Sequence, residues 1–284
     1  MKKIIFSLCL ILYTTLAFAD GKQDSILIIK ADWATKTTAE GLTHKQAQIK
    51  GLFNSVQSIN LIEIPRASKR KIGIAGNEGM KRTSLQATEK GAVAAINGTY
   101  YNMKEGNSVC FYKIGDTVID TTTDGEFKSR VNGAIREKRG KIEIIEWSKP
   151  IEQSYKKSKG TVLASGPIML DNGKRSDWSA CSKSFIETRH PRSAIYTKGD
   201  GTVVFITVDG RSAGNADGVS IPELAYLVKI LGGYDAINLD GGGSTTLYAE
   251  GENGSGIVNH PSDNKKFDRE GERHVVNALL FIRK

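Results

Sequence analysis

Short apolar runs, bounded by glycine, proline and charged residues, repeat along the chain and predict strands more often than helices. Val56 to Ile64 alternates apolar and polar residues and predicts a strand that ends at Pro65. Ala92 to Ile96 is continuously apolar, as expected of a central strand that is covered on both faces. Ser193 to Tyr196 and Thr202 to Val208 flank a glycine-containing turn and predict a pair of strands.

Further strands are predicted along the rest of the chain. They are Ser25 to Lys30, Lys71 to Ala75, Lys141 to Trp147, Thr161 to Leu170, Ala236 to Leu239 and Val275 to Ile282. In contrast, Lys149 to Lys159 is charged and contains few apolar residues, so we expect an exposed excursion there.

Two capping boxes predict the starts of helices. Ser220 to Glu223 is followed by apolar residues at helical spacing until Gly232, where the helix is expected to stop. The same type of pattern at Thr83 to Gln86 predicts a short helix that stops near Gly91. Helices placed among many strands, with no repeat and no low-complexity linker, favour one α+β domain with mixed β-sheets and flanking helices.

The first residues of the chain have the pattern of a secretion signal. Lys2 and Lys3 precede the apolar run Ile4 to Phe18, and Ala17 to Ala19 gives the small residues of a cleavage site. We therefore expect a signal peptide at 1–19 and a catalytic domain at 20–284. No later segment offers a membrane span. A short lysine-led signal before a compact domain predicts a bacterial protein, either periplasmic or secreted.

The charge and the cysteines limit the classes of partner. The formal net charge is +9, but the basic residues form short clusters without interleaved aromatic residues, so nucleic acid is not an expected partner. An anionic substrate and a generally basic surface both fit this charge. Cys110 and Cys181 allow either one disulfide or two free thiols. No cofactor is expected, no Cys/His cluster predicts zinc, and calcium remains an open alternative without any spacing that demands it.

Seven residues from Asp240 to Thr246 read Asp-Gly-Gly-Gly-Ser-Thr-Thr directly after a predicted strand. Three consecutive glycines cost conformational entropy, so they indicate backbone that turns sharply or that approaches a ligand closely. Backbone amides in such a corner can bind an anion or a sugar, and the carboxylate of Asp240 supplies an acid or a base. The candidate binding residues of the corner are Gly241, Gly242, Gly243 and Ser244.

A second carboxylate, Asp209, closes its strand as Asp240 closes the strand at 236–239. Cleavage of a glycosidic bond needs two carboxylates, of which one protonates the leaving oxygen and the other attacks or activates water. Asp-Gly is also a common turn pair, so each aspartate has an alternative interpretation as a turn residue.

Polar residues at other strand ends complete the candidate site. Arg192 and Arg211 are candidate clamps for a phosphate, or ion-pair partners of a nearby carboxylate. His190 is a candidate acid or base, with the alternative of a histidine that orders its loop. Glu223 is the third residue of a capping box, and we weight this role above a catalytic one. Asn97 closes an apolar strand and is a candidate to position substrate oxygens.

Five motifs, taken in the order in which they occur along the chain, resemble the phosphodiester glycosidase family. Members of this family include an enzyme that removes N-acetylglucosamine from a phosphodiester. The motifs are Asn97 to Tyr101, Gly166-Pro167, His190 to Ile195, Val208 to Arg211, and Ile221 through Thr246. The resemblance covers about residues 80 to 282. It implies a mixed α/β catalytic domain and hydrolysis of a sugar-1-phosphodiester.

The resemblance also carries over to individual positions. The residues that match are Asn97, Arg192, Asp209, Arg211, Glu223, Asp240, Gly241, Gly242, Gly243 and Ser244. The first motif departs from the family pattern Asn-Gly-Gly-Phe-Phe, because Thr99, Tyr100 and Tyr101 stand in its last three positions. This change alters the expected wall of the sugar site.

Three functional hypotheses follow. The first is an exported hydrolase that releases an N-acetylglucosamine-like sugar from a phosphodiester, with Asp240, Asp209 and Glu223 as the catalytic candidates. The second is a glycoside hydrolase that acts on phosphate-free envelope or host glycans. The third is a glycan-binding module without catalysis, against which the two aspartates and two arginines at strand ends argue.

Overall fold

The fold is organised around one large antiparallel sheet in the computed structural model, which describes residues 21–38, 41–68, 71–138, 141–155 and 160–282. The predicted signal peptide and its cleavage site lie outside these residues. The strand order of the large sheet is β1 (Ala34–Thr37), β2 (Thr43–Lys50), β3 (Val56–Ile64), β16 (Val203–Val208), β15 (Arg192–Lys198), β17 (Gly233–Asn238), β13 (Ile168–Asp171) and β14 (Lys174–Arg175).

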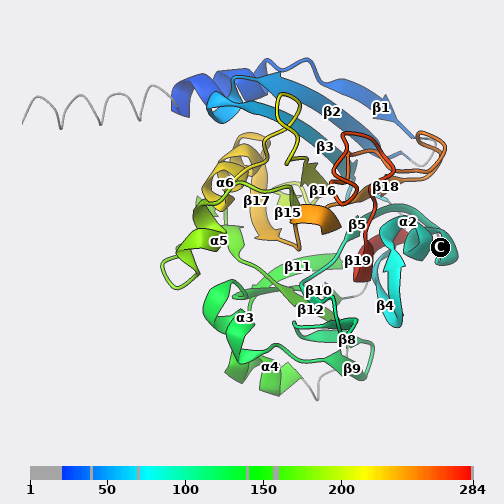
Figure 1. The fold of residues 1–284 in the computed structure, drawn as a ribbon. Coiled ribbons are helices and arrows are strands. Elements are labelled where there is room, and N and C mark those ends of the chain that lie inside the picture. The colour runs from blue at the N-terminus through cyan, green and yellow to red at the C-terminus, as the bar shows by residue number, and fades with distance from the viewer. Residues whose placement is uncertain (1–20, 39–40, 69–70, 139–140, 156–159, 283–284) are drawn as a thin grey trace, which may run out of the picture.

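Two smaller antiparallel sheets pack next to the large one. The five-stranded sheet has the order β11 (Lys141–Glu146), β10 (Gly133–Lys138), β12 (Thr161–Ser165), β8 (Tyr112–Ile114) and β9 (Thr117–Asp120). The four-stranded sheet has the order β18 (Leu247–Ala249), β5 (Ala92–Asn97), β19 (His274–Ile282) and β4 (Lys71–Arg82). A short ribbon joins β6 (Tyr101–Asn102) and β7 (Asn107–Ser108). In Figure 1 the five-stranded sheet lies below the large sheet and the four-stranded sheet lies at the right.

The helices are short and lie at the outside of the sheets (Figure 1). They are a helix at 21–29, α2 (Thr83–Glu89), α3 (Asp124–Ser129), α4 (Lys149–Tyr155), α5 (Lys183–Glu187) and α6 (Ile221–Ile230), with 3₁₀ turns η1 (Leu52–Asn54) and η2 (Gly242–Ser244). Among the described residues, no helix is both long and apolar enough to cross a membrane.

The large sheet is covered on both faces, which explains its continuously apolar strands. Val204 and Ile206 of β16 pack in a cluster with α6 and the helix at 21–29. Phe205, whose side chain points to the opposite face, packs in a second cluster with residues of the two smaller sheets. Neither face is left to solvent, so every residue of β16 is buried.

The α+β class with flanking helices is confirmed, and so are most predicted elements. β3, β5, β15 and β16 form where the apolar patterns placed them. At α6 the capping box is present in full: the Glu223 amide donates to the Ser220 hydroxyl, and the Ser220 amide donates to the Glu223 carboxylate.

The strand predicted at Ser25 to Lys30 is wrong, because the chain forms a helix at 21–29. Tertiary contacts decide the outcome: Ile28 is buried in the cluster that includes α6, and Tyr226 donates a hydrogen bond to the carbonyl of Gly21. Asp24 accepts a hydrogen bond of 3.0 Å from the Phe53 amide. Four apolar residues in a row do not distinguish a buried strand from a helix.

The capping box predicted at Thr83 is also wrong, although the helix itself forms. The N-cap of α2 is Arg82, without a side-chain cap. Glu272 takes the capping role from a distant part of the chain, since it accepts hydrogen bonds from the Ser84 amide (2.7 Å) and hydroxyl (2.6 Å). Gln86 instead donates to the Lys81 and Val275 carbonyls.

Part of the predicted exposed excursion is ordered structure. Residues 149–155 form α4, and the rest of the excursion, 156–159, lies outside the described residues. Glu152 is buried because its carboxylate accepts hydrogen bonds from the Thr122 amide and from the indole N–H of Trp147. Cys110 and Cys181 are free thiols, the first buried and the second half-buried.

Candidate active site

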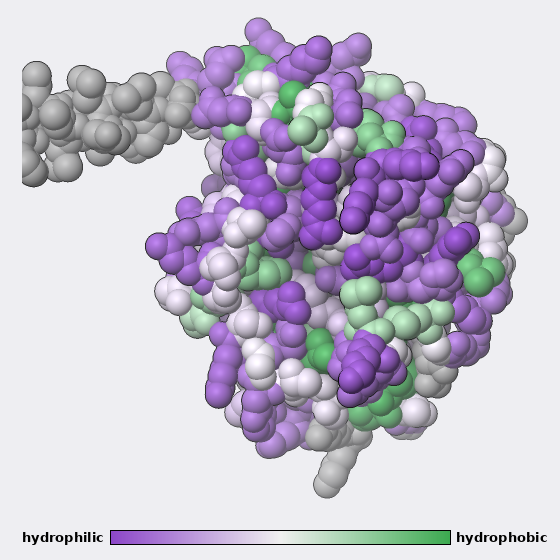
Figure 2. Space-filling model, in the orientation of Figure 1, coloured by the Kyte–Doolittle hydropathy of each residue, from purple (hydrophilic) through white to green (hydrophobic). Residues whose placement is uncertain are grey.

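The polar ends of several strands meet at one edge of the large sheet. Arg192, at the start of β15, pairs with Val208 at the end of β16, and Asn238 at the end of β17 pairs with Ala194. Antiparallel pairing therefore brings together motifs that are far apart in the sequence. Figure 2 shows a hollow in the middle of this face of the molecule, with strongly hydrophilic side chains along its upper border.

Asn97 joins three of these strand ends from the four-stranded sheet. Its amide oxygen accepts hydrogen bonds from the Ser193 hydroxyl (2.6 Å) and the Thr246 amide (3.1 Å). Its amide nitrogen donates to the Asp240 carbonyl at 2.7 Å. The side chain is fully buried, and these contacts make Asn97 a residue that positions the Asp240 backbone.

Asp240 has an unusual carboxylate. Among the described residues, the carboxylate accepts one hydrogen bond of regular geometry. The donor is the Gly241 amide, which lies 3.0 Å from Oδ1. Burial raises the pKa of Asp240 to about 6, and the Ser244 hydroxyl, Arg130 and Arg273 offset only part of that rise. A carboxylate with few donors in a low-dielectric position titrates near neutral pH, as a reactive acid or base does.

The glycines next to Asp240 leave room for arginine side chains. A Cβ atom on Gly242 would lie 2.9 Å from Nη2 of Arg211, and one on Gly243 would collide with the guanidinium of Arg273. A Cβ atom on Gly241 would lie 2.6 Å from the Pro191 carbonyl oxygen. Gly242 also has a φ of 62°, which favours glycine. The three glycines thus allow two guanidinium groups to approach the backbone closely.

Arg192 is buried and is held by backbone carbonyls alone. Its Nε donates to Val219 at 3.1 Å, and its Nη2 donates to Phe185 and Thr188 at 3.0 and 2.9 Å. Burial lowers the pKa of Arg192 to about 10, so the group stays charged at neutral pH. Among the described residues, neither Arg192 nor Arg211 forms an ion pair with a carboxylate. The alternative prediction, that these arginines are ion-pair partners of a nearby carboxylate, is therefore wrong for these residues. Arg211 is exposed and has a φ of 61°, a strained value for a residue with a side chain.

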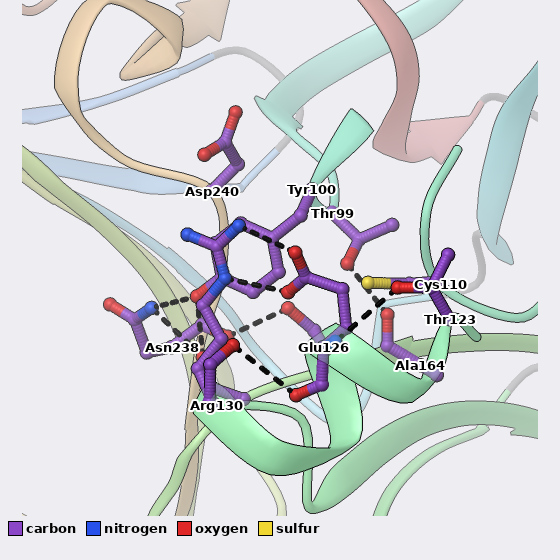
Figure 3. A network of polar contacts seen from close by, with 12 residues as sticks. Thr99, Tyr100, Cys110, Thr123, Glu126, Arg130, Ala164, Asn238 and Asp240 are labelled. Carbon is purple, nitrogen blue, oxygen red and sulfur yellow. Dashed lines mark hydrogen bonds and ion pairs between the residues drawn. The ribbon is translucent and has the colours of Figure 1, made fainter. Parts of the chain in front are cut away.

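Two further arginines near Asp240 were not predicted. Figure 3 shows Arg130, which donates to both oxygens of Glu126 at 2.7 and 2.9 Å and lies 3.7 Å from the centre of the Tyr100 ring. Asp240 lies just beyond this guanidinium (Figure 3). The charge of Arg130 lowers the pKa of Asp240 against the larger effect of burial.

Arg273 approaches the corner from the start of β19. It is paired with Asp263 and packs over Gly243. Tyr101 lies beside it, with its hydroxyl donating to the His274 carbonyl at 3.0 Å, and burial raises the pKa of Tyr101. An arginine directly before a strand is the one sequence signal that could have indicated Arg273.

Asp209 differs from Asp240 in that donors surround its carboxylate. Oδ2 accepts from Ser58 (2.7 Å), Asn60 (3.3 Å) and the His260 ring (3.1 Å). Oδ1 accepts from the Asn259 side chain (3.0 Å) and the His260 amide (2.9 Å). The residue is fully buried, which is not the environment of a turn residue. This geometry fits a carboxylate that holds the 259–260 segment in place.

Glu223 is used in holding the fold, whereas His190 lies near the arginines of the glycine corner. Glu223 completes the capping box of α6 and pairs with Arg189, so both of its oxygens are in use. His190 is half-buried, and burial together with the charges of Arg192 and Arg211 lowers its pKa. A neutral His190 therefore lies close to the two arginines without carboxylate partners.

The structure thus gathers Asp240, the glycine corner, Ser244, Arg192, Arg211 and His190, and adds Arg130, Arg273 and two tyrosines. The side chains of Asn97, Asp209 and Glu223 are fully engaged with the protein.

Both large cavities among the described residues, of about 890 and 610 Å³, lie elsewhere, along β11. The glycine corner is the place where a buried carboxylate with a raised pKa lies beside arginines, so the chemistry favours the corner. Within the described part of the chain, no group of three metal-ligating acidic, His or Cys side chains occurs.

The family of the chain is shown by a family model, and further comparisons give one sequence relative and several structures of the same fold. The family model of phosphodiester glycosidases (NAGPA) matches residues 90–282. An uncharacterized protein of Bacillus subtilis, the SPbeta prophage-derived YomE, is 25% identical over 262 residues. That alignment covers 92% of this chain and 37% of the relative, so the chain spans little more than a third of that protein.

Solved structures share the fold. The catalytic domain of zebrafish N-acetylglucosamine-1-phosphodiester alpha-N-acetylglucosaminidase, auto-inhibited by its pro-peptide, matches with a TM-score of 0.66 and 15% identity, over 89% of this chain and 88% of that chain. A hypothetical protein from Synechocystis matches with a TM-score of 0.64 and 16% identity, over 88% of this chain and 64% of that chain. At these identities, the likeness shows the fold alone.

Proposed function

Because the chain belongs to the phosphodiester glycosidase family, which supports a glycosidase-type hydrolase, we propose that it cleaves a sugar-1-phosphodiester. The bond that breaks joins the anomeric carbon to the phosphodiester oxygen. This oxygen leaves with its electron pair as part of a phosphate monoester, and water supplies the hydroxyl group of the released sugar. The proposed sugar is N-acetylglucosamine or a close relative of it.

The observation that carries this proposal is an ionisable carboxylate beside guanidinium groups that form no ion pair within the part of the chain that the structure describes. With a pKa of about 6, Asp240 is mostly ionised at pH 7 and can attack the anomeric carbon or take a proton from water. Arg192 and Arg211, which lack an ion-pair partner among the described residues, are available for the phosphate oxygens. Positive groups fixed where negative charge develops are a main source of catalysis.

The leaving group explains why one carboxylate suffices. A phosphate monoester is stable as an anion, so it needs charge stabilisation from the arginines more than it needs a proton from a second acid. Asp209 and Glu223, whose oxygens are all engaged, are then positioning residues. Asp209 holds the 259–260 segment in place, and Glu223 holds the start of α6.

The test is the release of free sugar from a synthetic N-acetylglucosamine-1-phosphodiester by the wild-type protein and by Asp240→Asn. We expect release by the wild type and a loss of about a thousandfold or more in the variant, the size typical of removing a nucleophile or base. A phosphate-free N-acetylglucosaminide is the matched substrate. Release from this substrate alone would favour an ordinary glycoside hydrolase, and saturable binding without product would favour a glycan-binding module.

We also propose that the protein is exported and acts in the periplasm or outside the cell. The lysine-led apolar segment at 1–18 supports this proposal. Fractionation of the producing cell, with sequencing of the mature N-terminus, tests it. We expect a mature chain that begins at Asp20, and a cytoplasmic chain that keeps Met1 would contradict the proposal.

A further inference from the structure

A second group of polar side chains lies on the large sheet, beyond Asp209. Gln46 and Gln48 of β2 pair with Asn60 and Ser58 of β3. Since side chains alternate along a strand and paired residues share a face, these four side chains point to the same side of the sheet. This side also receives the carboxylate of Asp209, which Ser58 and Asn60 contact. The sheet therefore presents a row of amide groups at this place.

The loop that follows Asn259 covers these amides and leaves a groove. His260, Phe267 and Arg269 of the loop line it, together with Gln46 and Asn60 of the sheet and the exposed Asp32, and its volume is about 330 Å³. This volume is at the lower end of the range of about 300–1,000 Å³ found for small-molecule sites. The groove therefore has room for a single small polar ligand.

The imidazole of His260 is fixed on two sides. Its Nδ1 lies 3.1 Å from Oδ2 of Asp209, and its ring stacks on Phe267 with centroids 4.0 Å apart and an interplanar angle of 14°. This contact with the Asp209 carboxylate favours the tautomer that carries its proton on Nδ1. Nε2, on the opposite side of the ring, is left to accept a hydrogen bond from a ligand.

Arg269 provides a positive charge at this groove. Its Nε is buried and has no hydrogen-bond partner within the described part of the chain, where the side chain also forms no ion pair. An unpaired buried guanidinium N–H costs free energy, and an oxyanion would remove that cost by accepting its hydrogen bonds. The Arg269 guanidinium is therefore placed to bind an oxyanion.

We propose that this groove binds a sugar that carries an oxyanion, either a phosphate or a carboxylate, at a site separate from Asp240. Arg269 binds the oxyanion, the amides of Gln46 and Asn60 and the Nε2 of His260 bind hydroxyl groups, and Phe267 supplies an apolar wall. Asn259 connects the site to the glycine corner, because its amide nitrogen donates both to Asp209 and to the Thr245 carbonyl, each at 3.0 Å. The proposal does not depend on hydrolysis at Asp240.

The test is a binding titration with three probes that contain no phosphodiester: N-acetylglucosamine 6-phosphate, glucuronate and uncharged N-acetylglucosamine. Binding is followed through the ring signals of His260 in proton–nitrogen NMR spectra. We expect the phosphate or the carboxylate probe to shift these signals and the uncharged sugar to bind at least tenfold more weakly. Whichever charged probe binds identifies the source of the oxyanion.

Two variants make the test specific to the groove. Arg269→Leu is expected to weaken binding at least tenfold with an unchanged or higher Tm, because it removes an unpartnered N–H. Gln46→Ala provides an independent change on the sheet side, and Arg66→Leu, in the separate cavity along β11, is the matched control that should bind normally. The proposal is overturned if neither charged probe shifts the His260 signals, if Arg269→Leu and Gln46→Ala bind like the wild type, or if Arg66→Leu alone loses binding.

Discussion

The two strand-end aspartates look alike in the sequence and have opposite surroundings in the structure. Asp209 accepts hydrogen bonds from Ser58, Asn60, Asn259 and twice from His260. Asp240 accepts one of regular geometry from the Gly241 amide, and burial raises its pKa. A carboxylate whose oxygens are all satisfied holds structure, whereas one that is buried with few donors is ready to react.

Exchanging each aspartate for asparagine gives the largest contrast. Asp209→Asn places an amide NH₂ against existing donors, so we expect the free energy of unfolding to fall by about 3 kcal/mol. Asp240→Asn removes a carboxylate whose ionised form the fold disfavours, so we expect unchanged or higher stability together with the loss of turnover. Urea unfolding at pH 7, with turnover per folded molecule, measures both effects.

The pH dependence of stability sharpens this contrast. The pKa of Asp240 is raised from 3.8 to about 6, so between these values the unfolded chain binds fewer protons than the folded one. The contribution of Asp240 to stability therefore falls as the pH rises through this window, by at most about 3 kcal/mol. The stability advantage of Asp240→Asn should accordingly be larger at pH 7 than at pH 4. Equal destabilisation by both asparagine variants would show that the two aspartates share one role.

The glycine corner offers a smaller effect. Gly243→Ala introduces a Cβ that collides with the guanidinium of Arg273, at a residue whose φ is not in the left-handed region. We expect turnover to fall about ten- to a hundredfold through displacement of this charge, with little change in Tm. Gly199→Ala is the matched control, because nothing lies within 4 Å of its added Cβ. Normal turnover in Gly243→Ala would remove Arg273 from the proposed site.

The pH dependence of turnover gives an effect that is about tenfold for each pH unit. If the ionised form of Asp240 is the active one, kcat/KM should fall about tenfold per pH unit below about pH 6. Initial rates between pH 4 and 8 on the phosphodiester substrate measure this limb. A rate that rises toward pH 4 would instead require the protonated form, and would make Asp240 a general acid.

The sequence predicted the elements whose signals are local. The capping box at Ser220 and the apolar run at Val203 to Val208 depend on neighbouring residues, and α6 and β16 form as expected. The strand predicted at Ser25 to Lys30 is wrong because the tertiary contacts of Ile28 and Tyr226 decide the structure of this segment. Similarly, Glu272 reaches the start of α2 across 188 residues of sequence, which no local pattern indicates.

For the candidate site, the sequence singled out the glycine corner without showing why it contains three glycines. Their positions next to Arg211, Arg273 and the Pro191 carbonyl follow only from the fold. Arg130 and Arg273 were missed because each is one of many basic residues until its distance to Asp240 is known. The distinction between Asp209 and Asp240 likewise depends on which donors surround each carboxylate.

The position of β19 has a consequence for how the protein is made. This strand lies between β4 and β5, so the four-stranded sheet is incomplete until residues 274–282 have been synthesised. Pairing between such distant segments gives a high contact order and slow folding. Until then β4 and β5 lack the strand that lies between them, and their unpaired edges stay open to pairing with other chains. Arg273 lies directly before the same strand, so the candidate site gains this charge only when β19 has joined the sheet.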